Sequence, residues 1–308
     1  MTKLSKPSII VILGPTASGK SALAVRLAKK LDGEVISADS RQVYRGLDIG
    51  TAKVVRDKRR TKSDTYFHEG VRHHLLSVAS PRRIFSVARY QILARHAIQD
   101  ILRRGKLPII CGGTGQYIDA VLGAAPLPDV PPDPRLRAKL EKLSPAELFT
   151  RLKKLDPRRA NAIDRHNPRR LVRALEIVLT TGRPVPKLKV ISYKPPVIVL
   201  KIGLFPGSEV LRGRINRRLA HDLRRGLTAE TEKLHAQGLS WKRLNELGLE
   251  YRYVARYLRG LMTHDEMTAK LQTELWRYAK RQMTWFKRDK DIRWIKTEGE
   301  ALKLIKKH

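Results

Sequence analysis

Thiols are almost missing from this sequence, and so is any long apolar run. Cys111 is the only cysteine among 308 residues, which excludes an internal disulfide and any zinc site built from several thiolates. No stretch approaches the roughly 18 apolar residues of a transmembrane helix, and the apolar run Ile9 to Leu13 passes directly into Gly14-Pro15. We therefore expect a cytoplasmic protein with neither a membrane span nor a signal peptide.

Acidic side chains are also scarce. Sixty-four Lys and Arg stand against 29 Asp and Glu, which leaves a formal net charge of +35. This charge exceeds what solubility needs, and its field would concentrate polyanions at the surface, so nucleic acid is the leading candidate partner. A highly charged surface of the thermophilic kind is the alternative, because charge excess alone does not identify a ligand. An acidic membrane is a weaker option.

Alternating strand and helix patterns indicate an α/β fold. Apolar residues recur every three or four positions in 21–31 and 86–102, which predicts helices there. Because these helices alternate with apolar runs, the strands should form a parallel sheet. The expected strands are 8–13, 34–38, 107–111 and 197–204, with a short fifth at 292–295. Further helices are expected at 145–155, 168–181, 209–225, 229–237 and from 264 towards 287.

A glycine-rich motif follows the first expected strand and opens the first expected helix. It reads Gly14-Pro15-Thr16-Ala17-Ser18-Gly19-Lys20-Ser21 and matches the P-loop pattern G-x-x-x-x-G-K-S/T. Backbone N–H groups of such a loop surround phosphate oxygens, the helix N-terminus adds a favourable dipole, Lys20 adds a charge and Ser21 can bind Mg²⁺. We therefore expect a pyrophosphate-bearing ligand on a core of the P-loop NTPase type.

Two groups of prolines suggest where this core is interrupted. A chain of this length suits about two domains, and no helix could cross Pro126 to Pro134. A second group, Pro184 to Pro196, precedes the fourth strand, and basic helical patterns lie between the groups. We expect a catalytic core of residues 1–123 and 196–308, with an inserted helical domain at 124–195.

The ends of the second and third strands carry polar residues. An ATPase normally has a strand ending in Asp that holds Mg²⁺, but the strand 107–111 is followed by Gly112-Gly113-Thr114. The Thr114 hydroxyl can hydrogen-bond a phosphate or a leaving group, but it cannot replace a carboxylate. Asp39, at the end of the second strand, is best placed to face the P-loop, because ligands of such sheets bind outside the carboxyl ends of strands. A helix cap is the alternative role for Asp39.

Further motifs accompany the P-loop along nearly the whole chain. They are Ser37 to Tyr44, Asp48 to Lys53, His73-His74-Leu75, Gly112-Gly113-Thr114 with Tyr117, Arg169 to Glu176, and Lys280 to Trp285. In order and spacing these motifs resemble those of the tRNA dimethylallyltransferases, the bacterial tRNA isopentenyltransferase family. Two of them are far more specific than the P-loop itself: Ser37 to Tyr44 with Asp48 to Lys53, and Gly112-Gly113-Thr114 with Tyr117.

The resemblance implies a prenyl transfer. A dimethylallyl group would pass from dimethylallyl diphosphate to the exocyclic amine (N6) of the adenosine at tRNA position 37, beside the anticodon, with release of diphosphate. The P-loop would hold the diphosphate with Mg²⁺, and the protein would act as a monomer on the tRNA anticodon stem-loop. By the same resemblance, Asp39 would be the general base, Thr114 would contact the diphosphate, and Arg214 would reach it from outside the P-loop.

The resemblance also implies a set of tRNA contacts. These positions are Asp39, Ser40, Arg41, Gln42, Thr114, Arg137, Arg169, Arg170, Leu171, Val172, Arg173, Tyr251 and Arg252. One departure lies among them, since the family commonly has Gly-Tyr-Lys or Gly-Tyr-Arg where this chain has Glu250-Tyr251-Arg252. Glutamate restricts the backbone and adds a negative charge, whereas Tyr251 and Arg252 retain a ring for stacking and a cation.

Other functions stay open at the level of sequence. A P-loop kinase or ATPase gains nothing from the basic charge, and a non-enzymatic RNA-binding protein leaves the P-loop and Asp39 unexplained. An adenylate isopentenyltransferase would act on a free nucleotide, but the charge favours an acceptor that offers many phosphates.

The basic charge makes one prediction that can be tested directly. Affinity for tRNA should fall steeply as the salt concentration rises, because each neutralised phosphate releases counterions. Equilibrium binding of tRNA over a salt series measures this slope. A flat response would mean that the basic surface serves another purpose.

Overall fold

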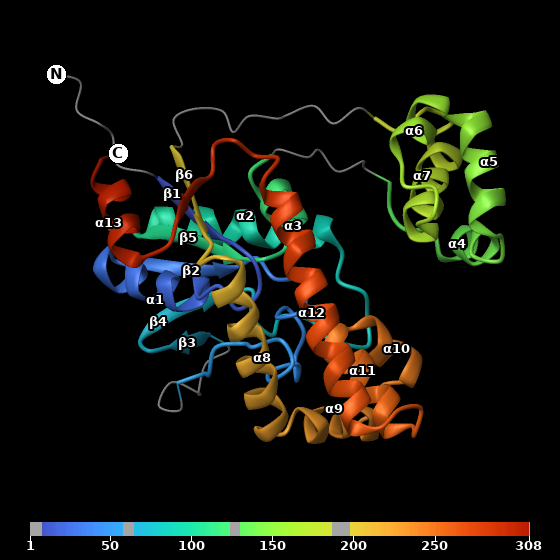
Figure 1. Cartoon of the computed structure of the whole chain (residues 1–308). Coiled ribbons are helices and arrows are strands. Elements are labelled where there is room, and N and C mark those ends of the chain that lie inside the picture. Colours follow the sequence, from blue (N-terminus) through green and yellow to red (C-terminus); the bar gives the residue numbers. More distant parts are fainter. Residues whose placement is uncertain (1–7, 58–64, 124–129, 187–197, 308) are drawn as a thin grey trace. The chain divides into compact units, whose positions relative to one another are not determined.

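The computed structural model describes residues 8–57, 65–123, 130–186 and 198–307. The chain forms two compact units, one from residues 1–122 with 193–308 and one from residues 123–192 (Figure 1). The sequence predicts domain boundaries after residues 123 and 195. The first borders the segment 124–129 and the second lies within 187–197, both of which are outside the described residues, so these boundaries stay predictions.

The larger unit is built on a sheet with seven described strands, in the order β3-β4-β2-β5-β1-β6-β7. The strands are β1 Ile9–Leu13, β2 Gly33–Ser37, β3 Tyr66–His68, β4 Val71–His74, β5 Leu107–Gly112, β6 Val199–Leu204 and β7 Arg293–Ile295. Neighbouring strands run parallel except β3 and β4, which pair antiparallel. The predicted parallel sheet is confirmed. The two short strands β3 and β4 are additions to it, because their mixed, partly exposed residues give no apolar run.

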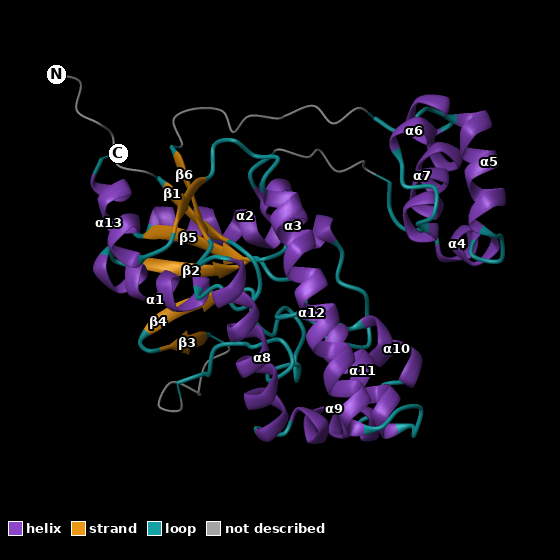
Figure 2. Cartoon of the chain, viewed as in Figure 1, coloured by secondary structure: helices purple, strands orange, loops and turns teal. Residues whose placement is uncertain are grey.

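Helices cover both faces of the central strands, which explains the unbroken apolar runs in their sequences (Figure 2). Alternate residues of β1 face opposite sides, so that Val11 packs with α2 and α3 whereas Ile12 packs with α1 and α13. These helices are α1 Lys20–Lys30, α2 Val87–Arg103, α3 Gly115–Val121 and α13 Glu298–Lys306. The two predicted helices after the first and second strands are confirmed to within one residue at each end.

A group of helices after β6 extends the core that lies on the α2 and α3 side of the sheet. Its members are α8 Ser208–Arg224, α9 Leu227–Ala236, α10 Trp241–Glu246, α11 Leu249–Leu258 and α12 His264–Phe286. A capping box of Thr263 and Glu266 starts α12, the longest of them. This helix runs from α9, α10 and α11 up to α3, beside the end of the sheet where the P-loop lies (Figure 1).

The smaller unit consists of helices that begin in the same way. They are α4 Pro134–Leu140, α5 Pro145–Leu155, α6 Pro157–Ala162 and α7 Pro168–Thr181. Each has proline in its first turn and an Asp, Ser or Asn side chain that accepts a backbone N–H at the N-cap. The predicted ranges of α5 and α7 are confirmed, and these two helices share a core of their own that includes Leu148, Leu152 and Leu175.

A buried carboxylate organises this smaller unit. The Glu176 side chain is fully buried and accepts hydrogen bonds from Arg137 Nε and Nη2, Arg173 Nη1 and the Asp133 N–H, at 2.5 to 2.8 Å. Burial alone would raise the pKa of Glu176, but these donors lower it to about 2. Glu176 thereby connects the start of α4 to α7.

The lowered pKa predicts the direction in which acid acts on the smaller unit. Because the folded pKa of Glu176 lies below its ordinary value of 4.5, its contribution to stability is complete above about pH 4.5 and is lost as the pH falls towards 2. Glu176→Gln should remove about 2 kcal/mol at neutral pH, allowing for the partly exposed guanidiniums. Hydrogen exchange of α4 to α7 in the whole chain measures the loss. Unchanged protection at pH 7 would contradict it.

Candidate active site

The P-loop leaves β1 through a tight turn and ends at α1. Gly14 has a φ of +151°, and a Cβ there would lie 2.5 Å from the Leu204 carbonyl oxygen, so glycine is required at this position. Gly19, with a φ of +97°, is the N-cap of α1, which starts at Lys20. Lys20 Nζ folds back and donates to the Pro15 carbonyl at 3.1 Å. Burial lowers the pKa of Lys20 and Asp39 opposes the shift, so the lysine and the carboxylate share one environment.

Two arginines of α8 reach the P-loop from the side. Arg214 Nη1 donates to the Ser18 carbonyl at 3.0 Å, and Arg218 Nη1 donates to Thr16 Oγ1 at 2.6 Å. Arg214 therefore lies where the sequence places it, beside the P-loop, and Arg218 joins it one helical turn later. The Ser18 hydroxyl is buried with no hydrogen-bond partner among the described residues. A buried hydroxyl without a partner, in a loop whose carbonyl oxygens are bonded by Lys20 and Arg214, suits an anionic ligand.

Gln282 of α12 connects the P-loop to the loop after β5. Its Oε1 accepts the Thr16 N–H at 2.8 Å, and its Nε2 donates to the Gly113 carbonyl at 2.9 Å. Only 6% of the residue is exposed. A Cβ on Gly113 would lie 2.3 Å from Nε2, so glycine at this position gives the amide room to pass between the two loops.

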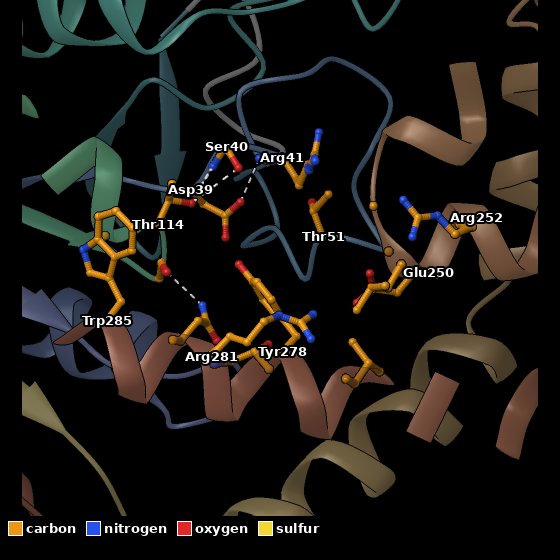
Figure 3. Close-up of a pocket in the computed structure, with 18 of the residues that line it drawn as sticks. Asp39, Ser40, Arg41, Thr51, Thr114, Glu250, Arg252, Tyr278, Arg281 and Trp285 are labelled. Carbon is orange, nitrogen blue, oxygen red and sulfur yellow. Dashed lines mark hydrogen bonds between the residues drawn. The ribbon is translucent and has the colours of Figure 1, made fainter. Parts of the chain in front are cut away.

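A cavity of about 470 Å³ opens beside this bridge. The P-loop contributes Thr16, the ends of β2 and β5 contribute Asp39 and Thr114, and α11 and α12 close the opposite wall. Figure 3 shows the Asp39 carboxylate pointing into the space between Thr114 and Glu250. The carboxyl ends of neighbouring strands and the P-loop thus meet at one site, as the parallel sheet requires.

Asp39 caps a turn and not a helix, so the helix-cap alternative is wrong, and its carboxylate also faces the cavity. Its Oδ1 accepts the backbone N–H of Arg41 at 2.8 Å and of Gln42 at 3.4 Å, so the side chain caps the turn after β2. That turn is not a helix, and its cap leaves the carboxylate at the cavity wall. Thr114 Oγ1 accepts the Ser40 N–H at 3.0 Å, which holds the two strand ends together.

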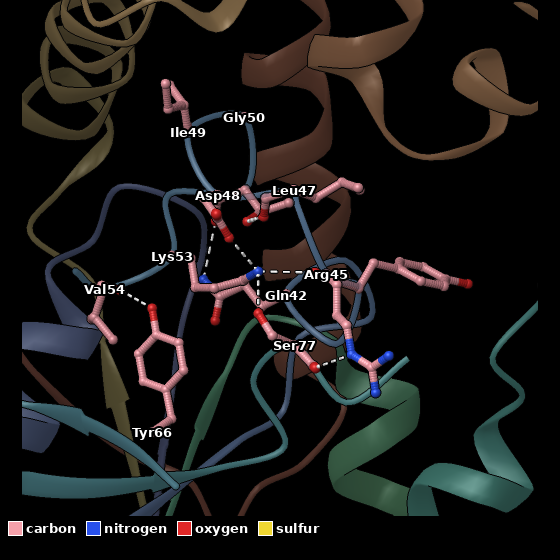
Figure 4. Close-up of polar contacts among 12 residues, drawn as sticks. Gln42, Arg45, Leu47, Asp48, Ile49, Gly50, Lys53, Val54, Tyr66 and Ser77 are labelled. Carbon is pink, nitrogen blue, oxygen red and sulfur yellow. Dashed lines mark hydrogen bonds and ion pairs between the residues drawn. The ribbon is translucent and has the colours of Figure 1, made fainter. Parts of the chain in front are cut away.

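The wall after Asp39 is fixed by a buried lysine (Figure 4). Lys53 Nζ donates to the Tyr44 carbonyl at 2.9 Å, to Asp48 Oδ1 at 2.6 Å and to Ser77 Oγ at 2.9 Å. Burial lowers the pKa of Lys53, whereas Asp48 opposes the shift. Gln42 Nε2 donates to the Thr51 carbonyl at 3.0 Å and closes the same loop. Gln42, one of the expected tRNA contacts, therefore braces the loop that presents Thr51 to the cavity.

A stacking role for Tyr251 is wrong, because the residue is fully buried. Its hydroxyl donates to Glu230 Oε1 at 2.6 Å, and a Cβ on Gly50 would lie 2.7 Å from its ring. Glu230 in turn accepts the N–H groups of Asp48, Ile49 and Gly50 at 2.8 to 3.1 Å. Tyr251 thus anchors the 48–50 turn and offers no face to a base.

The other expected tRNA contacts divide between the two units. Ser40, Arg41 and Arg252 line the cavity with Asp39 and Thr114. In the smaller unit Leu171 and Val172 are buried in the helical core, so side-chain contacts of these two with tRNA are wrong. Arg137 and Arg173 are paired with Glu176, while Arg169 and Arg170 are exposed at the start of α7.

The face of α12 that lines the cavity was not selected from the sequence. It carries Leu275, Tyr278, Gln282 and Trp285, with Arg281 beside them. Trp285 packs over Gly115 and donates to Asp119 Oδ2 at 3.0 Å, and it also faces the cavity. The three- and four-residue spacing of these side chains was a signal that could have identified this face.

Comparison with known proteins decides the family. The family model described as IPP transferase matches residues 42–289 of this chain. The chain belongs to the IPP transferase family. Its relatives include the tRNA dimethylallyltransferase of Anoxybacillus flavithermus, which is 42% identical over 296 residues, or 96% of this chain and 92% of the relative.

Solved structures in the IPP transferase family support the same assignment. The full-length tRNA isopentenylpyrophosphate transferase of Bacillus halodurans is 37% identical, covers 98% of this chain and 95% of its own, and superposes with a TM-score of 0.69. A eukaryotic dimethylallyltransferase acting on tRNA is 27% identical, with 94% of this chain and 73% of its own covered and a TM-score of 0.76. The P-loop-type core is therefore a property of the family.

The P-loop of this IPP transferase has hydroxyl oxygens of the kind that Mg²⁺ accepts, and the Mg²⁺ expected from the sequence stays a prediction. Ser21 lies in the first turn of α1, and the orphaned hydroxyl of Ser18 lies in the loop before it. Mg²⁺ is usually held by a few protein oxygens and substrate phosphates and retains several waters. A Ser21 hydroxyl beside a bound diphosphate meets that description.

Among the described helices, none is long and apolar enough to cross a membrane.

The Gln282 bridge generates a prediction for this IPP transferase. Gln282→Ala leaves the Thr16 N–H and the Gly113 carbonyl without their partner, which should cost about 1–3 kcal/mol of stability and loosen the P-loop. Urea unfolding measures the loss. Gln272→Ala, on the same helix but outside the cavity lining, is the matched control and should change little. Equal effects of both substitutions would contradict the bridge.

Proposed function

We propose that this IPP transferase moves a dimethylallyl group from dimethylallyl diphosphate to N6 of the adenosine at tRNA position 37, beside the anticodon. The observation that carries the proposal is the single cavity that contains both Asp39 and Thr16 of the P-loop. A donor held by its diphosphate at the P-loop would present its prenyl carbon towards Asp39. The names of the relatives agree with this reaction.

The cations around the P-loop serve the leaving group. As the bond between the prenyl carbon and oxygen breaks, negative charge accumulates on the diphosphate, which Lys20, Arg214 and Arg218 stabilise. Arginine suits this role because its planar fork pairs with phosphate oxygens. Thr114 offers a hydroxyl from the opposite loop. Bound Mg²⁺, held by Ser21, would add charge stabilisation at the diphosphate.

Asp39 serves the acceptor. The N6 amine is conjugated with adenine and is a weak nucleophile, so its proton must leave as the new C–N bond forms. The Asp39 carboxylate, fixed by the backbone N–H groups of Arg41 and Gln42, receives that proton. No water has to be aligned for attack in this reaction, which fits Gly112-Gly113-Thr114 in place of an aspartate after β5.

The acceptor must be a tRNA nucleotide that leaves its stack. Extrusion of a base costs a few kcal/mol, and a closed pocket offsets that cost. Tyr278 and Trp285 provide aromatic surface, and Arg41, Arg252 and Arg281 provide cations around the same cavity. Arg169 and Arg170 of the smaller unit offer exposed charge for the anticodon stem-loop. A kinase or ATPase does not explain the net charge of +35, and it is not favoured. A cytoplasmic location and a monomeric state stay predictions from the sequence.

Loss of Asp39 tests the reaction. With Mg²⁺, dimethylallyl diphosphate and unmodified tRNA, the protein should increase the mass of one tRNA nucleoside by one prenyl unit. Asp39→Ala should lower kcat by about 10² to 10⁴, because the base is removed. It should leave pyrophosphate binding within about twofold, because the P-loop is intact. Nucleoside mass analysis gives the first readout and calorimetry the second. Consumption of ATP with unchanged nucleoside mass would refute the proposal.

A further inference from the structure

A carboxylate occupies the wall of the cavity opposite Asp39. Glu250 lies in the first turn of α11, two residues after the N-cap Gly248, and only 14% of its side chain is exposed. Figure 3 shows its carboxylate directed into the cavity, across from Asp39. Burial raises the pKa of Glu250 and the charge of Arg218 opposes the shift. A buried carboxylate of this kind needs a cationic partner.

Arg218 is that partner; it is hydrogen-bonded on two sides, and its Nε is buried without a hydrogen-bond partner among the described residues. Its Nη2 lies 3.2 Å from Glu250 Oε1, and its Nη1 donates to Thr16 Oγ1 at 2.6 Å. Its Nε lies 3.6 Å from Oδ2 of Asp222, one turn further along α8. The three groups belong to α11, the P-loop and α8, so each edge of the planar guanidinium faces a different element.

We propose that Glu250 is a positioning residue that holds Arg218 against the P-loop for the donor diphosphate. Without Glu250, the anion left beside Arg218 is Asp222, which belongs to the same helix and draws the side chain back along α8. With Glu250, the Nη1 edge stays at Thr16, where it can meet a phosphate oxygen. The proposal rests on the proposed function, in which the P-loop binds the diphosphate of the donor.

Glu250 has two opposing effects on the affinity for diphosphate, and the larger of them decides whether its removal weakens or strengthens binding. Its negative charge repels a diphosphate, but the ion pair with Arg218 cancels most of that charge at a distance. Its hydrogen bond keeps the long, flexible side chain of Arg218 in one rotamer. Without this bond, the Arg218 side chain has to be ordered when the diphosphate binds. The positive end of the Arg218–Glu250 pair faces the P-loop. The benefit of holding the Arg218 side chain in place should therefore exceed the repulsion between Glu250 and the diphosphate, so removal of Glu250 should weaken diphosphate binding.

The test measures pyrophosphate binding by calorimetry in the presence of Mg²⁺, using the whole chain. Glu250→Ala should weaken binding by about five- to tenfold and raise KM for dimethylallyl diphosphate by a similar factor, with KM for tRNA within about twofold. Glu250→Gln retains an acceptor for Nη2 and should recover most of the affinity. Glu246→Ala is the matched control, since it removes the same charge from another arginine pair, with Arg243, on α10.

A double-mutant cycle shows whether the effect passes through Arg218. In an Arg218→Ala background, Glu250→Ala should cause no further loss of pyrophosphate affinity. Unchanged or tighter binding by Glu250→Ala, or an equal loss in both backgrounds, would overturn the positioning role while leaving the P-loop assignment intact. Absence of pyrophosphate binding by the unsubstituted protein would overturn the P-loop assignment and this proposal with it. If Glu250→Ala does not fold, Glu250→Leu, which retains the side-chain volume and removes the acceptor for Arg218, makes the same comparison.

Discussion

The side-chain amide of Gln282 satisfies a donor of the P-loop and an acceptor of the loop after β5 at the same time. Neither loop has regular secondary structure that could satisfy these backbone groups internally, and both are partly or fully buried. The distance between Thr16 and Thr114 is therefore set by a residue of a third element, α12. The cavity, its aromatic wall and the reach of Asp39 all follow from where that helix lies.

Charged side chains perform similar work around the site. Lys53 holds the 44–48 loop, Glu230 holds the 48–50 turn, and Glu250 holds Arg218. Lys53 and Glu230 each satisfy several groups of a neighbouring segment, which a hydrophobic contact could not orient. The cavity wall is thus held by side chains and not by regular secondary structure. Tyr251 belongs to this framework, and Gln42, which the resemblance assigns to the RNA, braces it as well.

The order of β1, P-loop and α1 was predictable because each part is specified by neighbouring residues: an apolar run, glycines at special φ angles and a helical period. Asp39 was predictable from its place at the end of a strand. Arg218 and Gln282 were not, since their roles depend on contacts 202 and 266 residues away in the chain. The burial of Tyr251 depends in the same way on the absence of a side chain at Gly50. The local sequence pattern therefore identified the P-loop, whereas contacts between residues far apart in the chain determine which side chains surround it.

The separation of Thr16 and Gln282 by 266 residues also has a consequence for biosynthesis. The ribosome completes the glycine-rich loop early, but at about 5–20 residues per second it adds Gln282 only roughly 13 to 53 s later. Arg214 and Arg218 are added in the course of that interval, and α12 only at its end. A nascent chain that has not yet reached α12 therefore has the phosphate-binding residues but no wall of α12 to complete the cavity.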